Sequence, residues 1–531
     1  MKSQLAKIQR IMYQRLQGYA RAHSPGASGE LRQYHQDYRR DVHHFRRLST
    51  KRELIEEALE APLVIVGDYH TLPQAQRTLV RIVRACLPLL RGKKIILALE
   101  WLRPEDTITV GRYLRSQISE DRFLREVCFF ERWGFDWHNY RPLFEFAKTH
   151  GLCIVGLAKL GERNLKARDR SAAQQLANLR RLEPDSHIFV LIGDLHLATS
   201  HLPAELKRKL PGTPVVTVHQ NIDNFYWALV EKGLEHTIDV VEIRPHTFCV
   251  LNTPPWLKLQ SHLKWLEVTD SQRNINNRSL TDAFSEIDFS PDIVHIVRHL
   301  QSFLGIPKLP VGTDFQVVGP SDFRPNRKKS VTTLINSFES FSLPEENTIF
   351  LSNLSANQLA SQTTILFHSR LSGLVTPFLN PRRDFYTYVW IEALGFLGSK
   401  IINPKRKCNG PQDLEKIAEE RSVRPLHREF VITPNVAEWS LAALKREPRL
   451  ADRLPSTANP ERLVFYYKCA KILGHLLGQG LYQGVVLRKI SRNELRRLFL
   501  TPLTDPKLLY RRWTNRLDAH ELREQSKNDT F

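Results

Sequence analysis

Two stretches of the chain share one pattern: LVIVGDYH at residues 63–70 and FVLIGDLH at residues 189–196. Each is an unbroken apolar run followed by Gly-Asp-x-His. Such a run, ended by glycine, is typical of a strand that is buried on both faces of a parallel sheet. Glycine lets the backbone turn sharply and approach a ligand, and ligands of open α/β sheets bind beyond the carboxyl ends of the strands. Both motifs are therefore predicted to lie at a binding edge.

The sequence around these motifs alternates between short apolar runs and stretches with helical spacing. Further strands are predicted at Ile95–Leu99, Cys153–Leu157 and Val215–Val218, with a terminal pair at Asp239–Ile243 and Thr247–Leu251. Helices are predicted at Gln76–Leu90, within Ser119–Thr149, at Ala167–Leu182 and at Pro203–Leu210. Continuous apolar strands separated by helices favour an α/β fold over residues 55–255, with a mainly parallel sheet covered by helices on both faces.

The rest of the chain is predicted to be mostly helical. Residues 1–50 form a basic helical segment, and residues 256–531 form a largely helical region with a connector at residues 310–330. Helical spacing in the second region is found at Trp256–Leu266, Asp292–Phe303, Tyr386–Leu397, Asn435–Leu444 and Glu461–Leu477. No sequence motif in this region indicates a function.

Histidines and carboxylates follow the predicted strands. In an extended chain residues i and i+2 point the same way, so Asp68 is expected beside His70, and Asp194 beside His196. Glu100 leaves a third buried strand at the same edge, where an unpaired acid is costly to bury. The five side chains are candidate ligands of a divalent metal, or they form an acid and base pair. A structural interpretation stays open for each motif alone, since Asp often caps the next helix.

Two further features allow a functional and a structural interpretation. Arg168-Asp169-Arg170 opens a helix, where an arginine can clamp a carboxylate or phosphate or can form a structural ion pair. A run of aromatic residues either lines a flat cavity that fits a porphyrin or belongs to the core. Its members are Phe129, Phe130, Trp133, Phe135, Trp137 and Tyr140.

Taken in order, five motifs resemble the ChaN-type haem-binding uptake domain, in the superfamily of Tiki proteases and EreA-type erythromycin esterases. They are GDYH (67–70), ALEW (98–101), WGFDWHNYRPLFEFAKTHGLCIVGL (133–157), ARDRSAAQQL (167–176) and GDLHLATSHLPAEL (193–206). The resemblance covers about residues 55–250 and implies an α/β fold with a pocket at the strand ends. It implies His70, Glu100 and His196 as pocket residues, with Tyr140, Arg168 and Asp169 beside them.

Three classes of function follow. The first is a ChaN-like protein that binds haem or a divalent metal, with Asp68, Tyr69, His70, Tyr140 and His196 around the cofactor. The second is a hydrolase of the EreA or Tiki type, in which a histidine or Glu100 activates water and Arg168 steadies developing negative charge. The chain lacks the G-x-S-x-G elbow of serine hydrolases and the phosphate-binding glycine motifs.

The third class is a basic scaffold that binds nucleic acid or an anionic membrane surface. The formal charge of +21 is unevenly distributed: 10 basic and 3 acidic residues in 1–50, 28 and 25 in 51–250, and 39 and 28 in 251–531. Basic runs occur at Arg324–Lys329, Lys405–Lys407 and Arg492–Arg497, the last followed by Arg511 and Arg512. Without a recognised nucleic-acid motif, a solvated face is the default interpretation.

The remaining signals concern location and a second metal candidate. The six scattered cysteines favour reduced thiols. The first residues lack the apolar core of a signal peptide and a lipid-accepting cysteine, and no run is long enough to span a membrane. A cytoplasmic protein, at most peripheral to a membrane, is expected.

Asp292, His295 and His299 have the spacing of metal ligands on one helix face, although a histidine pair with this spacing is more often structural.

Overall fold

The computed structural model describes residues 2–23, 28–159, 161–162, 164–272, 288–306, 315–319, 329–336, 339–352, 355–374, 381–419, 432–444 and 460–517. The chain divides into two compact units. Residues 13–266 build the α/β unit, and residues 267–529 with the first twelve residues build the helical unit. No helix among the described residues is long and apolar enough to cross a membrane.

The α/β unit is built on an eight-stranded sheet with the order β1-β7-β8-β6-β2-β5-β3-β4. All neighbours from β8 to β4 are parallel, and the pairs β1-β7 and β7-β8 are antiparallel. The predicted parallel sheet and its terminal antiparallel pair are therefore confirmed. The strands are β1 (Arg47–Ser49), β2 (Leu63–Asp68), β3 (Ile95–Leu99), β4 (Cys153–Gly156), β5 (His187–Gly193), β6 (Val215–Gln220), β7 (Val240–Arg244) and β8 (Thr247–Val250).

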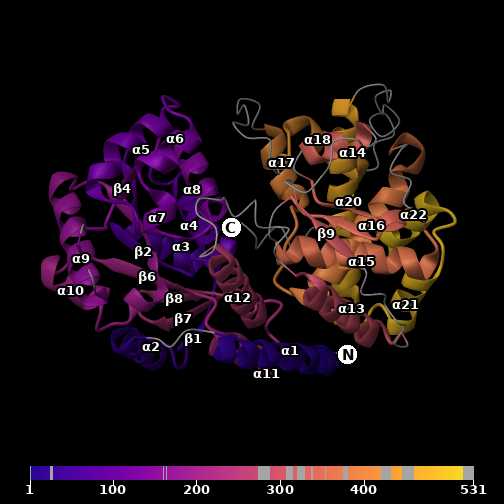
Figure 1. Cartoon of the computed structure of the whole chain (residues 1–531), viewed down its shortest axis with the longest axis horizontal. Helices are drawn as coiled ribbons and strands as arrows, with labels where there is room; N and C mark the ends of the chain where they lie inside the picture. Colours follow the sequence, from indigo (N-terminus) through magenta and orange to yellow (C-terminus); the bar gives the residue numbers. More distant parts are fainter. Residues whose placement is uncertain are drawn as a thin grey trace. The chain divides into compact units, whose positions relative to one another are not determined.

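Apolar side chains alternate between the two faces of this sheet, because successive residues of a strand point to opposite sides. In β2, Val64 and Val66 enter one core, whereas Leu63 and Ile65 enter another. Helices α4 (Pro73–Cys86) and α8 (Trp137–His150) pack on the first core, and α9 (Leu165–Leu182) and α10 (Leu202–Lys209) on the second. Figure 1 shows α9 and α10 on the opposite side of the sheet from α4 and α8. Cover on both faces explains the unbroken apolar strands.

The aromatic-rich stretch 119–149 forms three helices, α6 (Glu120–Glu126), α7 (Phe129–Arg132) and α8. The chain turns between them at Cys128 and Gly134, whose φ angles are 50° and 72°. The shorter elements nearby are α3 (Lys51–Glu60), α5 (Thr107–Leu114), α11 (Asp223–Lys232) and two 3-10 turns, η1 (Pro104–Asp106) and η2 (Asp194–Leu197).

Most of the predicted N-terminal segment belongs to the α/β unit. Helix α2 (Gly29–Asp41) contributes the fully buried Tyr34, and β1 pairs with β7 at the edge of the sheet. Helix α1 (Lys2–His23) precedes them. The α/β unit thus begins near Tyr13. The sequence instead predicted a separate segment at residues 1–50 and an α/β domain from residue 55.

The helices that the sequence predicted after residue 255 are present. The first, α12 (Pro255–Gln272), has residues 255–266 in the α/β unit. The helical unit contains the others, which are α13 (Ser290–Leu304), α16 (Pro381–Ile402), α18 (Pro434–Leu444) and α20 (Pro460–Val486). It also contains α14 (Lys329–Asn336), α15 (Ala356–Ser372), α17 (Pro411–Glu419), α21 (Arg492–Leu500) and α22 (Pro506–Arg516). A small sheet joins β9 (Gln316–Val318), β10 (Phe341–Leu343) and β11 (Thr348–Phe350).

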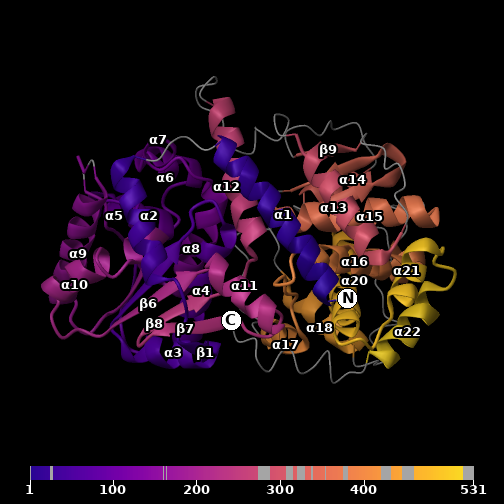
Figure 2. The same ribbon diagram turned by 90° about the horizontal axis from the view of Figure 1, so that it is seen from below.

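Of the predicted connector at 310–330, the structure describes residues 315–319, which include β9, and residues 329–330, which begin α14. The rest of the connector and the basic run 324–328 lie outside the described residues. In Figure 2 the elements of the helical unit can be followed by their colours, from α13 to α22.

Candidate functional site

The candidate site lies where three neighbouring strands end. β5 lies between β2 and β3, and Asp68 of β2 is in register with Gly193 of β5. Glu100 follows β3 directly, and its N–H donates to the carbonyl of Leu191 at 3.1 Å. The predicted juxtaposition of the two Gly-Asp-x-His motifs and Glu100 is therefore present in the fold.

Asp68 fixes the ring of His70. The Asp68 carboxylate accepts hydrogen bonds from His70 Nδ1 at 2.9 Å, from Gln76 Nε2 at 2.5 Å and from the Tyr140 hydroxyl at 2.9 Å. Asn139 Nδ2 also donates to the His70 carbonyl at 3.1 Å. Because Nδ1 carries the shared proton, Nε2 holds the ring's free lone pair. Among the described residues, Nε2 has no hydrogen-bond partner, and the side chain is 23% exposed.

The pKa of His70 is set by opposing effects. Burial lowers it, but the charge and hydrogen bond of Asp68, aided by the charge of Glu100, raise it above its usual value of 6.5. Tyr140 is fully buried, and burial together with the Asp68 charge raises its pKa well above the usual value. Tyr140 therefore acts as a donor that positions Asp68, not as an exposed ligand.

His196 is held in a different way from His70. Its Nδ1 lies 2.6 Å from Asp169 Oδ1, and its Nε2 lies 3.5 Å from Glu100 Oε1. Tyr34 donates to the other oxygen of Asp169 at 2.6 Å, and the Gly193 N–H donates to Glu100 Oε2 at 2.7 Å. A continuous chain of contacts thus runs from Tyr34 to the end of β5.

The two carboxylates that contact His196 favour its protonated form. Burial would lower the pKa of His196, but hydrogen bonds to Asp169 and Glu100 raise it to about 10. Burial would raise the pKa of Glu100, but the hydrogen bond and charge of His196 lower it to about 2. A protonated imidazole with both nitrogens engaged is neither a metal ligand nor a base. The two motifs are alike in sequence but different in chemistry.

The expectation that Asp194 shares a side with His196 is wrong, because β5 ends at Gly193 and residues 194–197 turn as η2. This turn directs His196 to Asp169 and leaves Asp194 against Gly67, where Asp194 Oδ1 is buried with no hydrogen-bond partner among the described residues. Burial raises the pKa of Asp194 to about 7; Asp68 adds to the shift, and Lys258 and His70 oppose it.

A pH dependence follows for His196. A raised pKa means that its contribution to stability is complete below pH 6.5, the ordinary value, and is lost as pH rises toward 10. We expect the difference in unfolding free energy between the wild type and His196→Gln to shrink over this interval. Urea unfolding at pH 6.5, 8 and 10 measures it, and a difference that grows with pH would contradict the assignment.

Gly67 allows this close packing. A Cβ at Gly67 would lie 1.9 Å from Asp194 Oδ1 and 2.9 Å from Leu197 Cδ1, so both neighbours would have to move. We expect Gly67→Ala to destabilise the α/β unit by about 1–3 kcal/mol. Urea unfolding measures the loss of unfolding free energy. Gly92→Ala is unsuitable as a control, because the φ angle of Gly92 is positive and alanine would be strained there. Gly29→Ala, whose Cβ meets no atom within 4 Å, is the matched control.

Gly193 separates His70 from Glu100. A Cβ at this position would lie 3.3 Å from both His70 Cε1 and Nε2 and 3.5 Å from Glu100 Oε2. The free nitrogen of His70 and the Glu100 carboxylate therefore face the same small space. A glycine keeps that space open.

The aromatic run divides between core and site. Phe129, Trp137 and Tyr140 are buried in the core, and Phe130 is 48% exposed. Trp133 and Phe135 instead form a three-ring cluster with His70, with ring centroids 4.6 and 4.7 Å from the imidazole and 5.3 Å from each other. The core interpretation therefore holds for Phe129, Trp137 and Tyr140, whereas Trp133 and Phe135 lie beside His70.

Helix α12 makes further contacts near His70 that the sequence did not predict. Trp265 stacks on Phe135 at 4.9 Å and donates to the Gly134 carbonyl at 2.9 Å. His262 lies edge-on to Tyr69, with centroids 6.5 Å apart. Lys258 Nζ lies 5.5 Å from the Tyr69 ring, and burial raises the pKa of Tyr69 to about 12.

Two predicted roles fit the structure poorly. Arg168 is exposed on the first turn of α9, and no hydrogen bond joins its side chain to the cluster within the described residues, whereas its neighbour Asp169 is buried. In the described part of the chain, no three His, Cys, Asp or Glu side chains are placed to hold one metal ion. The predicted metal ligands instead contact other residues of the protein. Asp68 bonds His70, and His196 contacts Glu100 and Asp169. Asp194 packs against Gly67.

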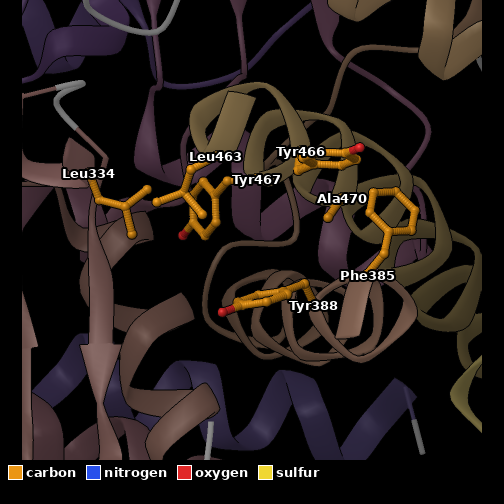
Figure 3. A pocket seen from close by; sticks show the side chains of 7 residues that line it. All are labelled: Leu334, Phe385, Tyr388, Leu463, Tyr466, Tyr467 and Ala470. Atoms are coloured by element: carbon orange, nitrogen blue, oxygen red, sulfur yellow. The ribbon is translucent and has the colours of Figure 1, made fainter. Parts of the chain in front are cut away.

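Other candidates carry less chemistry. His295 and His299 are in ring contact at 4.2 Å on α13, and His299 Nδ1 bonds the His295 carbonyl, so this pair is tied to its own helix. A small pocket in the helical unit lies between α16 and α20, and Figure 3 shows the rings of Tyr388 and Phe385 across from α20. Its lining is aromatic and aliphatic: Leu334, Phe385, Tyr388, Leu463, Tyr466, Tyr467 and Ala470.

Fold and site together define a doubly covered, mainly parallel sheet with a histidine and carboxylate cluster at its carboxyl edge. Residues 54–159 match the family model described as "Haem-binding uptake, Tiki superfamily, ChaN", which confirms the resemblance for this part of the chain. A solved structure titled "Cofacial heme binding to ChaN of Campylobacter jejuni" is similar at 13% identity, covering 33% of this chain and 89% of that chain, with a TM-score of 0.25. Among curated proteins no match is found.

Proposed function

We propose that the α/β unit binds haem at the carboxyl edge of its sheet, with His70 Nε2 as the iron ligand. One observation carries the proposal: His70 is held by a buried carboxylate through Nδ1, while Nε2 has no hydrogen-bond partner among the described residues and the partly exposed ring lies against two aromatic rings. A histidine whose second nitrogen donates to a carboxylate is a strong, oriented ligand. The family match of residues 54–159 supports haem as the ligand.

The side chains near His70 suit a flat apolar ring system. Trp133 and Phe135 are half-buried and lie against the imidazole, and Trp265 stacks on Phe135. Aromatic rings beside an iron ligand offer apolar surface against which a porphyrin can pack. When bound, haem would supply an iron centre; the residues of this chain hold and orient it. We also propose Tyr69 beside the group, because its ring contacts α12, the helix that carries Trp265.

The Asp68 hydrogen bond provides a sharp test. Asp68→Asn removes the carboxylate that fixes the tautomer and raises the basicity of His70, and we expect haemin affinity to fall about 10–100-fold. Titration with haemin, followed at the Soret band, measures the affinity. Asp136→Asn is the matched control, because Asp136 pairs with His138 in the same way at 3.1 Å but outside the cluster. Equal affinity in the wild type and Asp68→Asn would refute the role of Asp68.

Hydrolysis is a second candidate, favoured by the same Asp68–His70 pair. A histidine with a free Nε2, oriented by an aspartate and facing Glu100, has the arrangement of a general base that activates water. This function predicts turnover of simple esters by haem-free protein that His70→Ala abolishes. Haemin binding with no ester turnover would leave the first proposal alone.

A further inference from the structure

The helical unit carries a basic segment that the proposed function does not use. Residues 487–517 contain nine Lys or Arg and two acidic residues, a formal charge of +7. They comprise the turn after α20, helix α21 and helix α22. The structure shows how these charges are arranged and which apolar side chains accompany them.

Helices α21 and α22 follow one another in the chain, and we call them with their connection the α21–α22 hairpin. Arg516, at the end of α22, pairs with Glu494 near the start of α21 at 2.6 Å and donates to the Lys489 carbonyl at 3.1 Å. At the other end, residues 501–505 connect the two helices. Figures 1 and 2 both show α21 and α22 as neighbours in the helical unit.

Both acidic residues of the hairpin are already engaged. Glu494 accepts from the Ser491 N–H at 2.8 Å in a capping box and also pairs with Arg516. Asp505 caps α22 by accepting from the Leu508 N–H at 3.0 Å. Four exposed arginines form no ion pair with any described residue. They are Arg488, Arg497, Arg511 and Arg512.

Three exposed leucines lie close to these arginines in the sequence. Leu487, Leu500 and Leu508 are 55%, 37% and 62% exposed, and they are three of the ten large apolar side chains that are exposed in the described chain. On α22, Leu508 shares one outward face with Arg511 and Arg512, at i, i+3 and i+4. Leu500 shares a face with Arg497 on α21.

We propose that the α21–α22 hairpin docks this protein on the surface of an anionic lipid bilayer. Uncompensated arginines attract acidic headgroups, and leucines between them gain free energy by entering the interface. Nucleic acid would use the arginines but would gain little from exposed leucines, because phosphate contacts dominate its affinity. The combination of charge and leucine favours lipid.

The test is sedimentation of the full chain with vesicles of phosphatidylcholine containing phosphatidylserine. Arg511→Gln with Arg512→Gln is expected to weaken binding about 30-fold. Leu500→Gln with Leu508→Gln is expected to weaken it about tenfold at unchanged charge. The matched control is Leu89→Gln with Arg91→Gln, an exposed leucine and arginine on the α/β unit, which should bind as the wild type does.

The leucine variant separates lipid from the alternatives. All substituted positions are exposed, so circular dichroism should show folded protein throughout. Absence of binding to phosphatidylserine vesicles would overturn the proposal, as would equal binding by the wild type and the leucine variant. Binding to duplex DNA that depends on the arginines but not on the leucines would assign the surface to nucleic acid instead.

Discussion

Replacing His70 with alanine should abolish the Soret change that haemin produces with the wild-type protein. The substitution removes the only imidazole of the cluster that has a free nitrogen, because both nitrogens of His196 are engaged. We expect affinity to fall by more than the 10–100-fold that loss of a supporting carboxylate causes. Haemin titration by absorbance measures the loss.

Imidazole in solution distinguishes loss of a ligand from loss of structure. The cavity left by His70→Ala lies against Trp133 and Phe135, and added imidazole is expected to restore part of the Soret change there. His138→Ala is the control, because His138 also pairs with an aspartate but lies outside the cluster. Wild-type haemin affinity in His70→Ala would show that His70 is not the ligand.

Replacing His196 with alanine should cost stability instead. The change leaves Glu100 and Asp169 buried without their shared cation, and breaking a buried pair in this way costs about 3–5 kcal/mol. Hydrogen exchange of the β2 and β5 amides measures the loss within the α/β unit. His70→Ala, whose ring is partly exposed, should lower the same free energy by about 1 kcal/mol or less.

Neutralising the partners tests the cause. His196→Leu combined with Glu100→Gln and Asp169→Asn removes all three charges, and we expect it to recover much of the lost stability. If His196→Ala destabilises β2 and β5 no more than His70→Ala does, then His196 is not the buried cation described above.

The sequence predicted the sheet well because its strands are unbroken apolar runs with glycine at their ends. The order of motifs also brought His70, Glu100 and His196 to one edge. Helix α15 was missed because residues on all its sides are buried, from Leu359 to Ser369, so it lacks the periodic apolar face that marks a helix.

The different roles of the two histidines could not be predicted. They depend on whether the chain after each strand stays extended or turns as η2, and on Tyr34 and Asp169, which meet across 135 positions of sequence. Likewise, α12 follows the strands and carries no motif, yet Trp265 reaches Phe135. Contacts between distant residues decide these features, and local sequence patterns do not record them.

The most direct measurement is pulsed electron paramagnetic resonance of the ferric haem complex made with ¹⁵N-histidine-labelled protein. A histidine nitrogen bonded to iron gives a strong ¹⁵N coupling. We predict that coupling in the wild type and in His196→Gln, and its loss in His70→Ala. A coupling that survives in His70→Ala, or that is lost only in His196→Gln, would contradict the assignment of His70 as the haem ligand.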